Sequence, residues 1–106
     1  MVNEEIIQGI VSTIVTGLRP RRVILFGSYA RGQAGADSDL DLFIELDAPL
    51  PLHGRAARVK RLFDPYPCPM DVVVYTPEEV DYWRRAAASL VASVLKEGKV
   101  LYERGH

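Results

Sequence analysis

The connection between two strand-like segments constrains the topology of this chain more than any other feature. Residues 21–27 read RRVILFG, a short β-prone run that ends at a glycine, and residues 39–46 read DLDLFIEL, which begins with strict alternation. Residues 28–38 between them are turn-rich, with room for about one or two helical turns. Because a parallel crossover needs about a dozen residues or more, usually a whole helix, we expect these two strands to be antiparallel.

Helical and strand-like patterns alternate along the rest of the chain. Asn3 is suited to cap a first helix, and Thr76 opens a second start signal that continues with proline and glutamate. The patterns predict a helix over residues 4–17, an amphipathic helix over 55–64, a strand over 70–75, one long helix over 77–97 and a short strand or extended tail over 99–103.

These elements predict a single domain over residues 1–106 with an α/β (α+β) fold. The helix between the second and third strands suits a right-handed parallel crossover. We therefore expect a small mixed sheet of three to four strands in the order 1-2-3, flanked by helices. In this topology three strand ends meet at one edge of the sheet, carrying Gly27 and Ser28, Asp39 and Asp41, and Asp71.

Periodicity also assigns faces to the elements. In the second strand, we expect the side that holds Leu40, Leu42 and Ile44 to meet the core. The other side carries Asp39, Asp41 and Phe43. In the helix over 55–64 we expect Ala56, Val59 and Phe63 to point inward and Arg55, Arg58 and Arg61 largely outward. Tyr82 and Trp83 allow two interpretations, as core residues or as anchors of an interface.

Composition excludes several classes of protein. The formal net charge of −1 argues against a broad basic surface, so no direct binding of nucleic acid is expected. No apolar run is long enough to span a membrane, and the acidic N-terminus is unlike a secretory signal. With one cysteine the chain forms no internal disulfide. These features favour the cytoplasm, and an uncovered apolar patch on so small a domain leaves a homo-oligomer open.

The acidic edge of the predicted sheet indicates a metal site. Clustered carboxylates are unfavourable unless one is protonated or a cation binds. Oxygen ligands without histidine or cysteine favour Mg²⁺ or Mn²⁺, which proteins commonly bind together with substrate phosphates. A Gly-Ser turn beside these carboxylates is suited to a phosphate group. The combination indicates phosphoryl or nucleotidyl transfer, and neither a P-loop nor a dinucleotide-binding glycine motif is present.

The segment GSYARGQAGADSDLDL resembles the signature of the nucleotidyltransferase superfamily that includes DNA polymerase β. Gly27 and Ser28 are followed after ten residues by Asp39-x-Asp41, and Asp71 in MDVVVY corresponds to the third carboxylate of the family. The size of the chain and its ending KEGKVLYE are similar to the minimal nucleotidyltransferases of bacteria and archaea. The resemblance covers nearly the whole chain and implies the polymerase β-like fold.

The resemblance also implies roles for individual residues. Gly27 and Ser28 would hold the β- and γ-phosphates of a nucleoside triphosphate, with supporting contacts from two further residues of the motif, Arg31 and Ser38. Asp39 and Asp41 would bind the Mg²⁺ or Mn²⁺ ions. Asp71 would bind the second ion or help to deprotonate the acceptor hydroxyl. We expect no second domain to close over the base.

Minimal nucleotidyltransferases are commonly paired with a small all-helical HEPN toxin, for which they serve as the antitoxin. Some members transfer AMP from ATP to a tyrosine of the toxin, and the resemblance implies this activity here. Two alternatives stay open. The chain could be a binding module that neutralises its partner by occlusion, or it could modify a small-molecule hydroxyl, although enzymes of that kind generally carry an extra helical domain.

Overall fold

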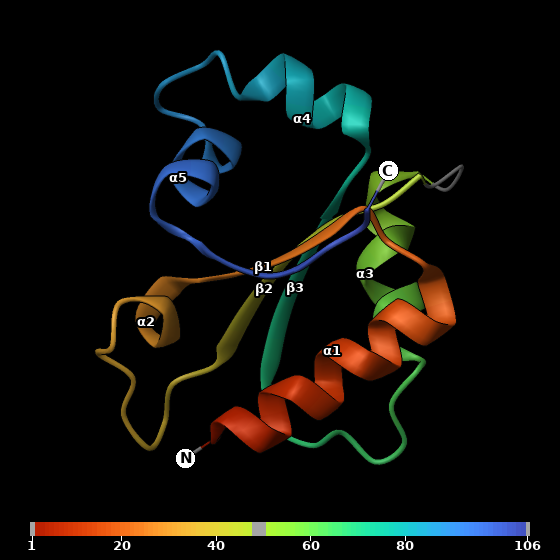
Figure 1. Ribbon diagram of the computed structural model, residues 1–106, viewed down its shortest axis with the longest axis vertical. Helices are drawn as coiled ribbons and strands as arrows, with labels where there is room; N and C mark the ends of the chain where they lie inside the picture. The colour runs from red at the N-terminus through yellow and green to blue at the C-terminus, as the bar shows by residue number, and fades with distance from the viewer. Residues whose placement is uncertain (1, 48–50, 106) are drawn as a thin grey trace.

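The computed structural model describes residues 2–47 and 51–105 and contains five helices and four strands (Figure 1). In chain order these are α1 (Glu4–Leu18), β1 (Arg22–Phe26), α2 (Gly27–Ala30), β2 (Leu40–Glu45), α3 (Leu52–Lys60), β3 (Met70–Tyr75), α4 (Pro77–Trp83), α5 (Leu90–Glu97) and β4 (Lys99–Glu103). No helix in the described ranges is long and apolar enough to cross a bilayer.

The four strands form one mixed sheet in the order β3-β2-β1-β4. β1 is antiparallel to β2, and β2 is parallel to β3, as the lengths of the two connections predict. The fold class is therefore confirmed. The predicted order 1-2-3 is extended by β4, which pairs antiparallel with the free side of β1 and has a register irregularity opposite Val23 and Ile24.

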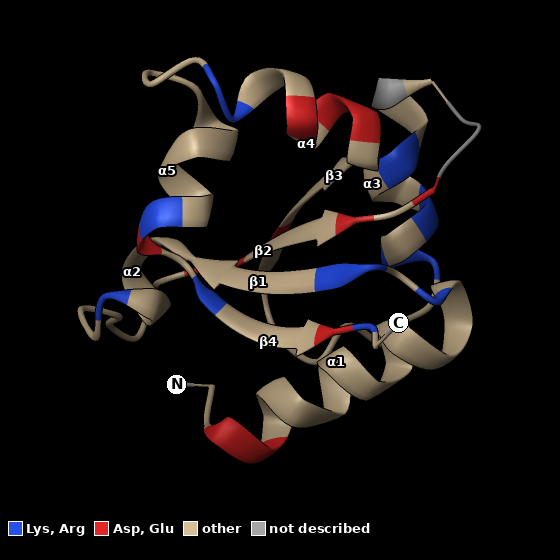
Figure 2. Ribbon diagram, turned by 45° about the horizontal axis from the view of Figure 1, so that its top comes forward, with Lys and Arg blue, Asp and Glu red and all other residues tan. Residues whose placement is uncertain are grey.

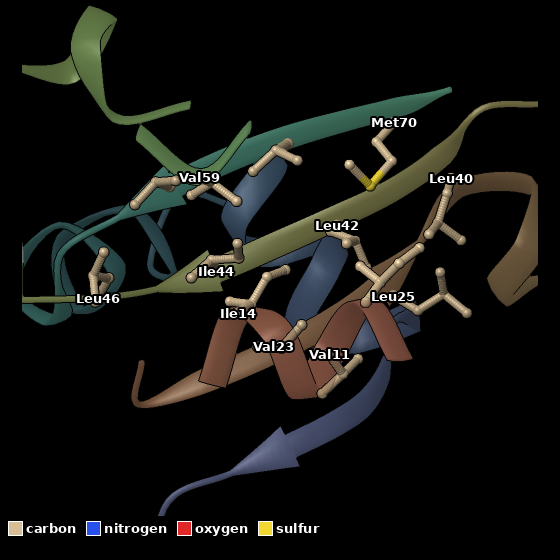
Figure 3. Packing of buried hydrophobic residues seen from close by; sticks show 13 residues of the cluster. Val11, Ile14, Val23, Leu25, Leu40, Leu42, Ile44, Leu46, Val59 and Met70 are labelled. Carbon is tan, nitrogen blue, oxygen red and sulfur yellow. The ribbon is translucent and has the colours of Figure 1, made fainter. Parts of the chain in front are cut away.

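Helices lie on both faces of the sheet, so the buried core has two parts, one on each face, while the edge strand β4 is largely exposed. Figure 1 shows α1 and α3 on one side and α4 and α5 on the other. The first side packs around Ile14, Leu42 and Val59, which are fully buried (Figure 3). The second side packs around Phe43, also fully buried, against Val80 of α4 and two valines of α5, Val91 and Val94. Phe43 thus belongs to a second small core on the side that carries the aspartates.

The prediction of one long helix over residues 77–97 is wrong, because the chain forms two helices there. α4 ends at Trp83, and Ser89 begins α5 by accepting a hydrogen bond from the N–H of Ala92 while donating one to the carbonyl of Trp83. Residues 81–88 are all exposed, so no core contact favours a continuous helix over this local capping. Tyr82 is 70% exposed, and the core interpretation of the Tyr82–Trp83 pair is therefore wrong.

Arg55 was expected to point outward, and this is also wrong. The helix α3 begins three residues earlier than predicted, and the Arg55 side chain is buried. Its Nη1 lies 2.5 Å from Oε1 of Glu79 in α4 and 3.5 Å from the carbonyl oxygen of Val74. The ion pair therefore joins a helix on one face to a helix on the other, across the edge strand β3. Arg58 and Arg61 are exposed as predicted.

We expect Glu79→Gln to lower the free energy of unfolding by about 2–3 kcal/mol at neutral pH. Glutamine can still complete the capping box with Thr76, so the change isolates the charge that faces the buried Arg55. Chemical denaturation measures the difference, with the exposed neighbour Glu78→Gln as control. Equal stability of the two variants would contradict a structural role for the ion pair.

The same contact predicts a pH dependence. Burial opposes ionisation of Glu79, but hydrogen bonds from Arg55 and from the Thr76 N–H outweigh it and lower the pKa below the ordinary value of 4.5. The ion pair therefore stabilises the fold fully above about pH 4.5, and this contribution is lost as the pH falls through the lowered pKa. The difference between wild type and Glu79→Gln should shrink over that acid range in denaturation curves.

Candidate active site

The register of the sheet brings the predicted site residues to one rim. Phe26 at the end of β1 pairs with Asp41 in β2, and Asp41 pairs with Asp71 in β3. Paired residues of adjacent strands project to the same face, so Asp41 and Asp71 project beside one another. Asp39 lies just before β2 and is exposed. The edge at which Gly27, Asp41 and Asp71 meet is the one that the connection lengths predict.

Gly27 allows an unusually close approach between the first turn and Asp41. Its φ is +72°, a conformation that side chains disfavour, and a Cβ at this position would lie 2.0 Å from Oδ2 of Asp41. The short helix α2 follows at once, with the Arg31 N–H bonded to the Gly27 carbonyl and the Gln33 N–H to the Ser28 carbonyl. The turn therefore holds its backbone against the carboxylate, with Ser28 beside it.

The carboxylates of the rim repel one another. Partial burial raises the pKa of Asp41, and the charges of Asp71 and then Asp39 raise it further, while Arg31 opposes them. Burial, together with Asp39, also raises the pKa of the Cys68 thiol. The positive charge of Arg31 therefore offsets the negative charge of the rim only in part.

An all-oxygen set of this kind fits a hard divalent cation such as Mg²⁺. Within residues 2–47 and 51–105, no three acidic, histidine or cysteine side chains already converge closely enough to hold an ion. Asp39 and Asp71 are exposed and Asp41 is partly buried, so the two outer carboxylates have room to turn toward Asp41. The pair on adjacent strands is thus the centre of the candidate metal site, with Asp39 at its flank.

Arg31 and Ser38 have local partners. The Arg31 side chain is exposed, and its Nε donates to Oε1 of Gln33 at 3.2 Å. Oγ of Ser38 accepts the N–H of Gly35 at 2.9 Å and thereby shapes the loop before β2. The predicted contacts of both residues with phosphate stay predictions, and for Ser38 the hydroxyl already has a structural role.

A cavity of about 290 Å³ opens beside the Gly-Ser turn and was not expected from the sequence. It lies between the start of α2 and one side of α5, and it is lined by Gly27 and Arg31 on one wall and by Ser93 and Glu97 on the other. The α5 residues read as part of an ordinary amphipathic helix, and no local signal marks them as neighbours of Gly27. A larger cavity of about 440 Å³ lies at the opposite end of β1, where Arg22 and Glu45 already pair at 2.6 Å.

The fold and the rim together define the class of protein: a small mixed-sheet domain with a glycine turn facing paired aspartates. The family of nucleotidyltransferase domains matches residues 5–102, and the chain belongs to this family. It is a nucleotidyltransferase, and the predicted resemblance is confirmed at that level. Domains of this family generally use divalent metals and nucleoside triphosphates.

A solved structure supports the same fold. The crystal structure of a "putative nucleotidyltransferase" from Sulfolobus solfataricus superposes with a TM-score of 0.67, at 21% sequence identity, over 94% of this chain and 79% of that one. At this identity the likeness concerns the fold alone. No curated protein sequence matches the chain significantly.

Proposed function

We propose that this chain is a Mg²⁺-dependent (or Mn²⁺-dependent) nucleotidyltransferase that transfers AMP from ATP to a hydroxyl group of a protein partner. The observation that carries the proposal is the meeting of Gly27, Asp41 and Asp71 at one rim of the sheet. Family membership supports the reaction class, and the proposal adds the metal, the nucleotide and the acceptor.

The residues of the rim divide the reaction between them. The backbone N–H groups of Gly27 and Ser28 and the Arg31 guanidinium bind the phosphates, and Asp39 and Asp41 hold the cation. When bound, the cation neutralises charge on the triphosphate and polarises it. Asp71 helps to hold the cation or accepts the proton of the attacking hydroxyl. The hydroxyl oxygen forms a bond to the α-phosphorus, the bond from that phosphorus to the β-phosphate oxygen breaks, and pyrophosphate leaves.

We further propose that the acceptor is a tyrosine of a HEPN-family toxin and that the chain is its antitoxin. The resemblance to minimal nucleotidyltransferases supports this partner. The exposed Tyr82, Trp83 and Leu90 support a protein interface, because aromatic residues are enriched in such contacts. The same surface also favours a second candidate, neutralisation of the toxin by occlusion without any transfer.

Label transfer from α-labelled ATP to the HEPN protein, with and without Mg²⁺, tests the proposal. We expect transfer with the wild type that requires the metal, and mass spectrometry should place AMP on a tyrosine. Asp39→Asn should lose transfer because a ligand of the cation is removed. Folding of this variant is checked by circular dichroism.

Toxin neutralisation separates the two candidates. If Asp39→Asn still silences the toxin while transferring nothing, occlusion accounts for the antitoxin function. Undiminished transfer by Asp39→Asn would instead contradict the role of the rim carboxylates.

A further inference from the structure

We propose that α5 forms the second wall of the phosphate site, with Ser93 as a donor to the terminal phosphates and Glu97 as a repelling charge that weakens their binding. The inference rests on the proposed function and extends it to residues outside the signature motif. It concerns the β- and γ-phosphates of the nucleotide, and therefore also pyrophosphate, which is the same group after transfer.

The position of α5 is the first argument. Leu90, Ser93, Val94 and Glu97 follow helical spacing and share one side of α5, and all four line the cavity beside Gly27 and Arg31. Val94 is 2% exposed in the core under this side, so the helix is anchored where the cavity begins. In Figure 2 the charged C-terminal end of α5 lies next to α2. A ligand on the Gly-Ser turn would therefore contact α5.

The charge of the cavity wall is the second argument, and it favours a phosphate group over the nucleotide base as the occupant of the cavity. The Arg31 guanidinium is the cation of the cavity wall, and arginine is well suited to phosphate oxygens. The cavity also adjoins Gly27, where the resemblance places the β- and γ-phosphates. A base would have to lie farther along the nucleotide, beyond the α-phosphate. Ser93 lines the same cavity, and a serine hydroxyl is able to donate one hydrogen bond to a phosphate oxygen.

The negative charge of Glu97 is unfavourable for a phosphate ligand. It is exposed and forms no ion pair with any cation among residues 2–47 and 51–105. Its carboxylate therefore adds repulsion to an anion in the cavity and opposes Arg31. We infer that Glu97 limits retention of pyrophosphate after transfer, at the expense of affinity for ATP.

Isothermal titration with Mg²⁺ and three probes, ATP, pyrophosphate and AMP, tests the inference without any acceptor. Glu97→Gln should raise the affinity for ATP and for pyrophosphate by about three- to tenfold, which is the scale of one partly screened charge pair. Ser93→Ala should lower the affinity for the same two ligands by about three- to tenfold, because one hydrogen bond is lost. Neither change should alter AMP binding. Glu78→Gln, which removes an equal charge in α4, should leave all three unchanged.

The outcomes are distinguishable. Wild-type affinities in both α5 variants would overturn the role of α5 and leave the proposed function intact. A change in AMP binding without a change for pyrophosphate would also overturn it, because the cavity would then hold the base. If the wild-type chain binds neither ATP nor pyrophosphate, the proposed function and the inference fail together.

Discussion

Asp41→Asn is expected to abolish nucleotidyl transfer and to make the metal-free protein more stable. The carboxylate pairs in register with Asp71 and faces the turn at Gly27, so it is the central acidic group of the rim. Loss of a ligand that places a catalytic cation should cost about 4 kcal/mol or more in the transition state, which is about 10³-fold in rate. Label transfer under single-turnover conditions measures this effect.

The expected gain in stability of metal-free Asp41→Asn comes from removing a charge that is unfavourable without a cation. Partial burial and the charges of Asp71 and Asp39 destabilise an ionised Asp41, and asparagine removes the charge with little change in shape. We expect about 1 kcal/mol of added stability, which corresponds to about 4–8 °C in Tm for a domain of this size. Differential scanning calorimetry without metal measures the shift.

Asp37→Asn is the matched control for Asp41→Asn. Asp37 is exposed in the loop before β2, close in sequence to the site but outside the paired strands. It should keep wild-type transfer and wild-type stability. Loss of both activity and stability in Asp41→Asn would contradict the prediction, because a purely structural aspartate would behave in that way.

Gly27→Ala is expected to reduce transfer by about 10²-fold, since a displacement of about 1 Å at a reacting centre has an effect of that size. An added Cβ would lie 2.0 Å from Oδ2 of Asp41, so the carboxylate or the turn has to move. The positive φ of 72° adds about 1–2 kcal/mol of backbone destabilisation. Transfer assays and chemical denaturation measure the two effects separately.

Gly32→Ala separates close contact from backbone strain. Gly32 has nearly the same φ, +69°, but a Cβ there would meet nothing within 4 Å. It should lose similar stability and retain most of its activity. Equal activity losses in the two variants would show that flexibility of the turn, and not the approach of Gly27 to Asp41, is what the reaction needs.

Much of the fold could be predicted because its signals are local. The Asn3 cap accepts the Ile6 N–H, and the capping box at Thr76 and Glu79 is formed as expected. The rim of the sheet was also predictable, since the short connection to β2 and the helical connection to β3 leave one arrangement of strand ends. Gly27, Asp41 and Asp71 came together through this topology.

The errors arose where distant contacts override a local pattern. The sequence pattern places Arg55 on the outward side of α3, but the partly buried Glu79, 24 residues away, offers it a partner for an ion pair. The division between α4 and α5 follows from exposure of residues 81–88 to solvent, which a one-dimensional pattern of alanines and arginines does not report. The α5 wall of the cavity was missed for the same reason.

By itself, the amino-acid sequence determined most of the elements, the relative directions of β1, β2 and β3 and the acidic rim, because caps, periodicity and connection lengths act over a few residues. Only the tertiary structure decided what stands around that rim. Three features join residues that are far apart in the chain: the close contact of Gly27 with Asp41, the partly buried Arg55–Glu79 pair, and the cavity shared by Arg31, Ser93 and Glu97. Such contacts depend on how the helices pack on the sheet, and packing is set by the whole core at once.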